Sequence, residues 1–170
     1  MKVNIFSYRL EEPADSLAIE NLNAEAFGPG RFARAAYRLR EGVPHDPSLS
    51  FVAFHEGRLM ASVRLTPIAI GERPALLLGP LVVDPEFKGQ GAGKTLVRIA
   101  LDAAREVGHR VVMLVGDEPY YGPLGFTRLA PYAVTLPGPA DPARVLVAGL
   151  QPGALDGLFG EARKVLPAAP

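Results

Sequence analysis

The sequence contains no cysteine, so disulfide bonds, thiolate metal ligands and a cysteine nucleophile are all excluded. It has only three histidines, and His45, His55 and His109 are too scattered along the chain to show the spacing of a metal site. We therefore expect no metal ion in the function of this chain.

An excess of charge of one sign is also lacking, because eighteen Lys and Arg residues balance eighteen Asp and Glu residues. A chain without net charge has no long-range field that attracts nucleic acid or an anionic membrane. We expect neither as a partner, and any anion that the protein binds must be held by a local site.

Long apolar runs are absent too, since none approaches the ~20 residues that a membrane-spanning helix requires. The first residues, MKVNIFSYRLEEPAD, carry acidic side chains where a signal peptide needs an apolar core. These observations predict a cytoplasmic protein. A length of 170 residues favours one domain over residues 1–170, with no linker between two cores.

The sequence does contain alternating helical and strand patterns. The expected elements, in chain order, are helices at 15–27 and 30–40, strands at 50–54, 59–70 and 75–83, a helix at 91–107, a strand at 110–115, a short helix from 117, paired strands at 134–136 and 144–148, and a short helix within 151–170. This order indicates a mixed α/β sheet. Arg31, Arg34 and Arg38 fall on one face of the second helix, which we interpret as a solvated face rather than a patch for an acidic substrate.

One strand contains an anomaly. The apolar run Ala75–Val83 is typical of a central strand that is covered on both faces, yet it includes Gly79-Pro80. Proline cannot donate a hydrogen bond to the neighbouring strand. The sequence therefore predicts a bulge or a splayed edge at this point.

The segment Lys88–Lys94, KGQGAGK, connects that strand to the clearest helix. Glycines at alternate positions let backbone N–H groups converge without obstruction by Cβ atoms. At a helix N-terminus these amides and the helix dipole are suited to bind phosphate. Lys94, in the first turn, opposes the dipole unless an anion is bound.

Two familiar phosphate-binding motifs each fail by one residue. A P-loop would end in Gly93-Lys94-Thr95 but has Lys88 where its first glycine is required. A dinucleotide fingerprint could start at Gly89 and Gly91 but has Lys94 in place of the third glycine. A glycine turn that only connects two elements is a further alternative.

A third pattern matches. The segment LGPLVVDPEFKGQGAGKTLV resembles motif A of the GNAT superfamily of N-acetyltransferases, written Q/R-x-x-G-x-G/A after a strand that ends in Val-x-Pro. Here Lys88 takes the place of Gln or Arg. The family signature Y-x-x-x-G-F is matched by Tyr121–Phe126. The stretches GDEPYYGPLGF and PGALDGLFGEARKVLP look most like the predicted-acetyltransferase branch, whose members often lack an assigned substrate.

The resemblance implies a GNAT-type α/β fold. Its central, twisted sheet is mostly antiparallel, with a V-shaped splay between the two central strands and helices on both faces. It also implies acetyl-CoA as co-substrate, bound by a core at about 75–127, with 151–170 as a C-terminal tail. The implied cofactor-binding residues are Leu81, Val82, Val83, Lys88, Gly89, Gln90, Gly91, Ala92, Gly93, Lys94 and Tyr121.

The implied reaction is direct attack of a primary amine on the acyl group within a ternary complex. The Leu81 amide would stabilise the negative charge that develops on the carbonyl oxygen, and Tyr121 would be the general acid. The general base is left open; the candidates are Glu25, His45, His55, Glu72 and Glu118, and a chain of water molecules to bulk solvent is an alternative to any of them.

The acceptor could be a small-molecule amine or a protein amine, with Arg64 as a candidate for substrate contact. Homodimers are frequent among such folds. Two other functions stay open. One is a non-catalytic acyl-CoA-binding or sensor module, and the other is a nucleotide hydrolase.

Overall fold

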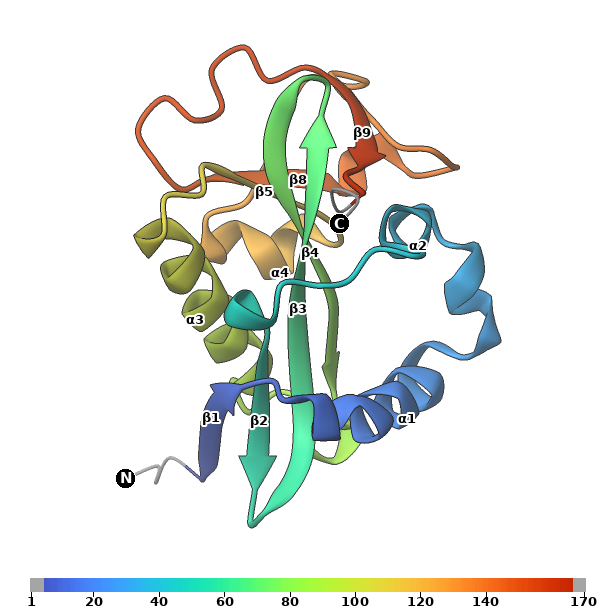
Figure 1. Cartoon of the computed structure of the whole chain (residues 1–170), viewed down its shortest axis with the longest axis vertical. Coiled ribbons are helices and arrows are strands. Elements are labelled where there is room, and N and C mark those ends of the chain that lie inside the picture. Colours follow the sequence, from blue (N-terminus) through green and yellow to red (C-terminus); the bar gives the residue numbers. More distant parts are fainter. Residues whose placement is uncertain (1–4, 167–170) are drawn as a thin grey trace.

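The computed structural model describes residues 5–166 (Figure 1). The helices and strands are β1 (Phe6–Leu10), α1 (Ser16–Phe27), α2 (Ala35–Arg40), β2 (Phe51–His55), β3 (Arg58–Ile70), β4 (Arg73–Val83), α3 (Ala92–Glu106), β5 (Val111–Val115), α4 (Glu118–Tyr121), β6 (Thr127–Arg128), β7 (Val134–Thr135), β8 (Val145–Gly149) and β9 (Gly160–Lys164). No helix within these residues is long and apolar enough to cross a bilayer.

The strands form a mostly antiparallel sheet in the order β1-β2-β3-β4-β5-β8-β6. On this path β4 and β5 are parallel neighbours, which requires a crossover that α3 provides. Their pairing covers only Leu76 with Val112 and Leu77 with Met113, although both strands continue. Beyond this point the two strands diverge. The predicted V-shaped splay between the central strands is thereby confirmed.

The bulge predicted from Gly79-Pro80 lies at the start of this splay. Val63 pairs with Leu81 and Leu65 pairs with Leu78, so the same interval holds one more residue on β4 than on β3. The irregularity falls within Gly79-Pro80, where the proline cannot donate a hydrogen bond to the neighbouring strand.

Both faces of the sheet are covered. Along β4, Leu76 and Leu78 face a core that contains the apolar side of α3, whereas Ala75 and Leu77 face the opposite core. Figure 1 shows α1 and α3 on opposite sides of β3 and β4. This double coverage explains why the central strands are continuous apolar runs. The expected helices on both faces are confirmed.

Three local expectations are wrong. Strand β1 was not predicted, and it pairs with β2 at the edge of the sheet. The helix expected at 30–40 is divided into a 3₁₀ turn over Pro29–Ala33 and α2, with Arg34 extended between them. The pair expected from 134–136 and 144–148 does not form, because β7 pairs with β9 and β8 pairs with β5 and β6.

The C-terminal segment also differs from expectation. In place of a short helix, 151–157 forms turns and β9 pairs with both β3 and β7. Short strands such as β7 and β9 depend on distant partners more than on their own residues, which explains why their sequence predicted them poorly.

Candidate active site

A cavity of about 250 Å³ lies between the end of β4 and the start of α3. We call it the glycine cleft. Ten of the eleven predicted cofactor residues line it; the exception is Gln90, which is exposed. Phe27, Phe87 and Tyr120 complete most of its wall. The structure therefore brings together residues from the strand end, the glycine turn and α4.

Glycine is required at different positions of this turn for different structural reasons. Gly89 and Gly91 have φ angles of 80° and 90°, in the left-handed region that favours glycine. Gly93 is needed for space, because a Cβ atom there would lie 2.7 Å from the Tyr120 hydroxyl and 3.2 Å from Val83 Cγ2. Each glycine thus keeps the turn close to its neighbours and open to the cleft.

The first turn of α3 faces the cleft without a side-chain cap. Gly91 is the N-cap residue, and no side chain in the described part of the chain bonds to this end of the helix. The leading amides of a helix have no partner within the helix itself. Lys94 lies beside them, with its Nζ 5.3 Å from the Tyr120 ring centroid. The arrangement offers amide donors and a cation to an anion.

Tyr121 is held firmly although α4 is only four residues long. Its ring makes edge contacts with Tyr120 at 4.8 Å and with Phe126 at 5.8 Å between centroids. It also covers Gly116, where a Cβ atom would lie 2.6 Å from Tyr121 Cε2. Burial, with smaller contributions from Tyr120 and Asp117, raises the pKa of Tyr121 to about 12. The phenol is therefore protonated at neutral pH and can donate a proton.

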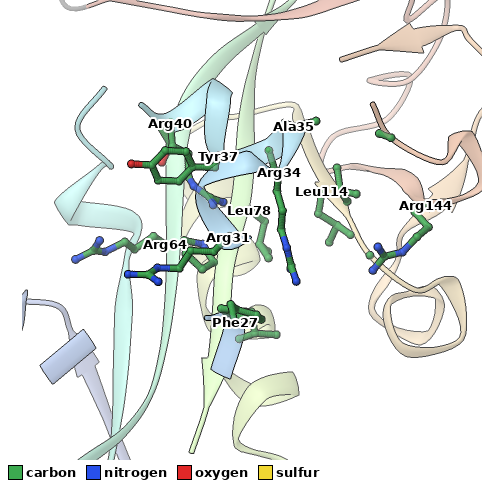
Figure 2. Close-up of a pocket in the computed structure, with 18 of the residues that line it drawn as sticks. Phe27, Arg31, Arg34, Ala35, Tyr37, Arg40, Arg64, Leu78, Leu114 and Arg144 are labelled. Atoms are coloured by element: carbon green, nitrogen blue, oxygen red, sulfur yellow. The ribbon is translucent and has the colours of Figure 1, made fainter. Parts of the chain in front are cut away.

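A second and larger cavity, of about 670 Å³, lies between the helices α1 and α2 and the splayed strands (Figure 2). We call it the arginine cavity, because five arginines line it: Arg31, Arg34, Arg40, Arg64 and Arg144. It shares Phe27, Leu81 and Tyr121 with the glycine cleft. The two predicted catalytic positions, Leu81 and Tyr121, thus lie where the two cavities meet.

Three of these arginines have carboxylate partners. Arg31 pairs with Glu20 at 2.8 Å, and Arg144 with Asp117 at 3.2 Å. Arg64 donates two hydrogen bonds to the buried Glu11, at 2.8 and 3.1 Å. Arg64 lines the cavity as a substrate-contact residue should, but its guanidinium is already engaged.

Glu11 also accepts from His45, whose Nε2 lies 2.8 Å from Glu11 Oε2. Burial by itself would raise the pKa of the Glu11 carboxyl. The hydrogen bonds from His45 and Arg64 outweigh burial and hold this pKa below its ordinary value. The ionised carboxylate therefore joins β3 to the segment before α1 at the cavity wall.

Arg40 differs from its neighbours. Burial, together with the positive charges of Arg64 and Arg34, lowers the pKa of Arg40 to about 10. Its Nη1 lies 3.1 Å from where a Cβ atom on Gly79 would be, beside the bulge of β4. Among residues 5–166 no carboxylate pairs with it. It remains a cation at neutral pH.

Of the five candidate bases, only His45 lines either cavity. Glu118 pairs with Arg128 at 3.1 Å, and the ring of His55 packs on Phe87 with centroids 4.8 Å apart. Glu25 and Glu72 are exposed away from both cavities. Among the five candidates, His45 is therefore the one that lies at a cavity wall.

The arginine face expected on 30–40 is confirmed only in part. Arg34 and Arg38 are exposed as expected, and Arg38 donates to the Pro137 carbonyl at 3.2 Å. Arg31 and Arg34 nevertheless line the arginine cavity, because the extended backbone at Arg34 breaks the helix face. Arg40 and Arg144 were not singled out from the sequence. Their spacing in the sequence does not predict a shared site, because they reach the cavity from separate segments.

No group of three or more His, Asp or Glu side chains within residues 5–166 could hold a metal ion. The chemical groups that line the two cavities include backbone amides, a buried phenol, a histidine and guanidinium groups. Such a set can bind an anionic co-substrate and can donate a proton beside it.

Comparisons with known proteins point to one family. The family model described as "Acetyltransferase (GNAT) family" matches residues 16–126. The uncharacterized N-acetyltransferase YjhQ of Escherichia coli (strain K12) is 31% identical over 130 residues, covering 74% of this chain and 72% of YjhQ. The uncharacterized N-acetyltransferase YhbS of the same strain is 30% identical over 155 residues, covering 89% and 92% of the two chains.

Solved structures give the same result. The crystal structure of YhbS from Escherichia coli in complex with CoA superposes with a TM-score of 0.82 at 26% identity, covering 97% of this chain and 92% of that one. A GNAT acetyltransferase from Brucella melitensis in complex with acetyl-CoA gives 0.60 at 28% identity, covering 89% and 98%. From its motifs, its splayed sheet and these matches, the chain belongs to the GNAT family of acetyltransferases.

Proposed function

We propose that this chain, as one domain over residues 1–170, transfers the acetyl group of acetyl-CoA to a primary amine by direct attack in a ternary complex. The observation that carries the proposal is the junction of the two cavities at Leu81 and Tyr121. One cavity suits the co-substrate and the other is left for the acceptor. Direct attack requires that both substrates reach the same point at once.

The glycine cleft has the features of a CoA site. Uncapped amides at the start of α3 and the nearby Lys94 suit the pyrophosphate. Beyond Leu77, no described strand pairs with the β5-facing edge of β4, so an extended pantetheine arm can lie along it. The complexes of YhbS with CoA and of the Brucella protein with acetyl-CoA support the same co-substrate.

When bound, acetyl-CoA supplies an activated acyl carbon. The Leu81 amide donates to the acyl oxygen, and one such donor contributes about 3 kcal/mol to the stabilisation of the transition state. A bond forms between the amine nitrogen and the acyl carbon while the carbon–sulfur bond breaks. The Tyr121 hydroxyl gives its proton to the departing sulfur, and the amine loses its proton to water or to His45.

The acceptor and several other properties of the protein remain predictions. The acceptor is a small-molecule amine or a protein amine, and Arg64 contributes to its cavity wall. A cytoplasmic location, a homodimer and the lack of a nucleic-acid or membrane partner are also predictions from the sequence and its family resemblance.

The first test is the melting temperature with saturating acetyl-CoA, with equal ATP as control. A ligand at a hundred times its dissociation constant stabilises by about 2.7 kcal/mol, which raises the melting temperature by roughly 5–10 °C at this size. A shift with acetyl-CoA, followed by thiol release when amines are added, supports the proposal.

Each alternative function has its own outcome in this test. A shift with acetyl-CoA but no thiol release with any amine would indicate a non-catalytic acyl-CoA-binding module. A shift with ATP alone would revive the nucleotide hydrolase. No shift with either ligand would contradict the cofactor assignment.

A further inference from the structure

The arginine cavity contains a positive charge that the protein itself does not neutralise. Arg40 is a half-buried residue of the cavity lining, and within the described chain it has neither a carboxylate partner nor a side-chain hydrogen bond. A desolvated charge without a partner is unfavourable. Such a group is expected where a ligand provides the opposite charge.

The neighbouring charges do not remove this excess. Arg31, Arg64 and Arg144 are each paired, and the Arg34 guanidinium lies over the Phe27 ring at 5.2 Å from its centroid. Figure 2 shows Arg34 and Arg40 reaching into the middle of the cavity, with Arg144 directed toward them from the opposite side.

The size of the excess indicates the kind of anion. The five lining arginines face three lining carboxylates, Glu20, Asp117 and Asp141, and Glu11 stands behind Arg64. Counted over these arginines and carboxylates, this leaves one positive charge. A singly charged carboxylate balances it, whereas a dianionic phosphate would leave an excess of negative charge. A guanidinium also matches the planar carboxylate with two parallel hydrogen bonds.

The position of Arg40 relates this anion to the reaction centre. Its guanidinium lies beside Gly79, and Leu81 follows two residues later on β4. Two residues of strand span about 7 Å. A small molecule held by its anionic group at Arg40 could therefore place an amine near the Leu81 amide.

We propose that the acceptor is an aminocarboxylate, whose carboxylate is bound by Arg40 while its amine faces Leu81 and Tyr121. The proposal rests on the proposed acetyl transfer, which it makes more specific. The same positive cavity disfavours diamines and polyamines, because their second charge would lie against unpaired guanidinium groups.

The test compares amines that differ only in one carboxylate: histidine with histamine, tyrosine with tyramine, and arginine with agmatine. Initial rates of thiol release give kcat/KM for each member. We expect the carboxylated members to be favoured by roughly ten- to a hundred-fold, the usual effect of a hydrogen bond to a charged group. Equal use of both members, or preference for the decarboxylated ones, would overturn the proposal. This comparison needs no variant.

Two variants identify the residue responsible. Arg40→Met should remove the preference, mainly by raising KM for the carboxylated member, and Arg40→Lys should restore part of it. Arg98→Met is the matched control, because Arg98 is exposed on α3 and lines neither cavity. A retained acetyl-CoA shift shows that each variant is folded. Persistence of the full preference in a folded Arg40→Met would contradict the assignment.

A binding measurement separates this proposal from the proposed function. Calorimetric titration of CoA-saturated protein with N-acetylhistidine and with N-acetylhistamine reports carboxylate recognition without turnover. Tighter binding of N-acetylhistidine that depends on Arg40 would support the carboxylate site even if no amine were acetylated. Absence of that difference, with turnover present, would overturn the carboxylate site alone.

Discussion

The glycine cleft and the arginine cavity meet at Leu81 and Tyr121 but are built in different ways. The cleft comes largely from the continuous stretch 81–94, and its recognition groups are backbone amides. The cavity collects long side chains from α1, α2, β3 and the loop before β8. Backbone recognition tolerates changes of side chain, whereas side-chain recognition changes with each substitution. This difference suits a shared co-substrate on one side and a particular acceptor on the other.

Tyr121 belongs to both regions, and its substitution should have the largest effect. We expect Tyr121→Phe to lower kcat by roughly 100-fold or more, the usual contribution of a general acid. The shift in melting temperature with acetyl-CoA should be retained, because the ring contacts are unchanged. Because burial raises the pKa of Tyr121 to about 12, the wild-type rate should not fall between pH 8 and 10 through loss of this proton.

Tyr120→Phe is the control for that experiment, since Tyr120 lines only the glycine cleft and should have a smaller effect on kcat. Full turnover by Tyr121→Phe would show that the phenol only packs beside the co-substrate. The junction would then be a binding feature and not a catalytic one.

Substitution of Glu11 tests whether the stability of the wall of the arginine cavity depends on charge. Glu11→Gln keeps the shape but leaves Arg64 without an anion, so we expect a loss of about 2–3 kcal/mol at pH 7 by denaturant unfolding. Because the pKa of Glu11 is lowered in the folded protein, its ionised carboxylate stabilises the fold at pH values above its ordinary pKa of about 4.3. This stabilisation is lost as the pH falls through the lower, folded-state pKa.

The stability difference between wild type and Glu11→Gln should therefore shrink as the pH is lowered from 6 to 3. Exposed Glu25 provides the control, and Glu25→Gln should change stability by less than about 0.5 kcal/mol. A Glu11→Gln protein as stable as wild type would mean that the buried network contributes little to the cavity wall.

The smallest expected effect on stability comes from the two glycines that flank α3. Gly91 and Gly108 have φ angles of 90° and 92°, and a Cβ atom at either would meet no atom within 4 Å. Alanine at either position should cost roughly 1–2 kcal/mol through backbone strain. Only Gly91→Ala should also weaken acetyl-CoA binding, measured by calorimetry.

Gly108→Ala matches the strain but lies outside both cavities, so its acetyl-CoA affinity should equal that of wild type. Equal affinity in both variants would argue against amide recognition at this turn. The proposed difference between the two regions, with backbone recognition in the glycine cleft and side-chain recognition in the arginine cavity, would then be unsupported.

The sequence by itself determined the features whose causes are local. Glycines at alternate positions, a proline in an apolar run and the helical spacing of 91–107 each limit the backbone where they occur. These limits predicted the glycine turn, the bulge and α3, and the family resemblance predicted the splay. Most of the residues assigned to the cofactor come from the same stretch of chain, and all but Gln90 line the cleft.

Only the tertiary structure decided the acceptor side. The break at Arg34 turns arginines of one expected helix face in different directions, and Arg40 and Arg144 come together only when distant segments fold onto the sheet. The partners of β7 and β9 were likewise fixed by contacts far along the chain. Local limits on the backbone depend on residues that are neighbours in the sequence, whereas the charge balance of a cavity depends on which side chains the completed fold places around it.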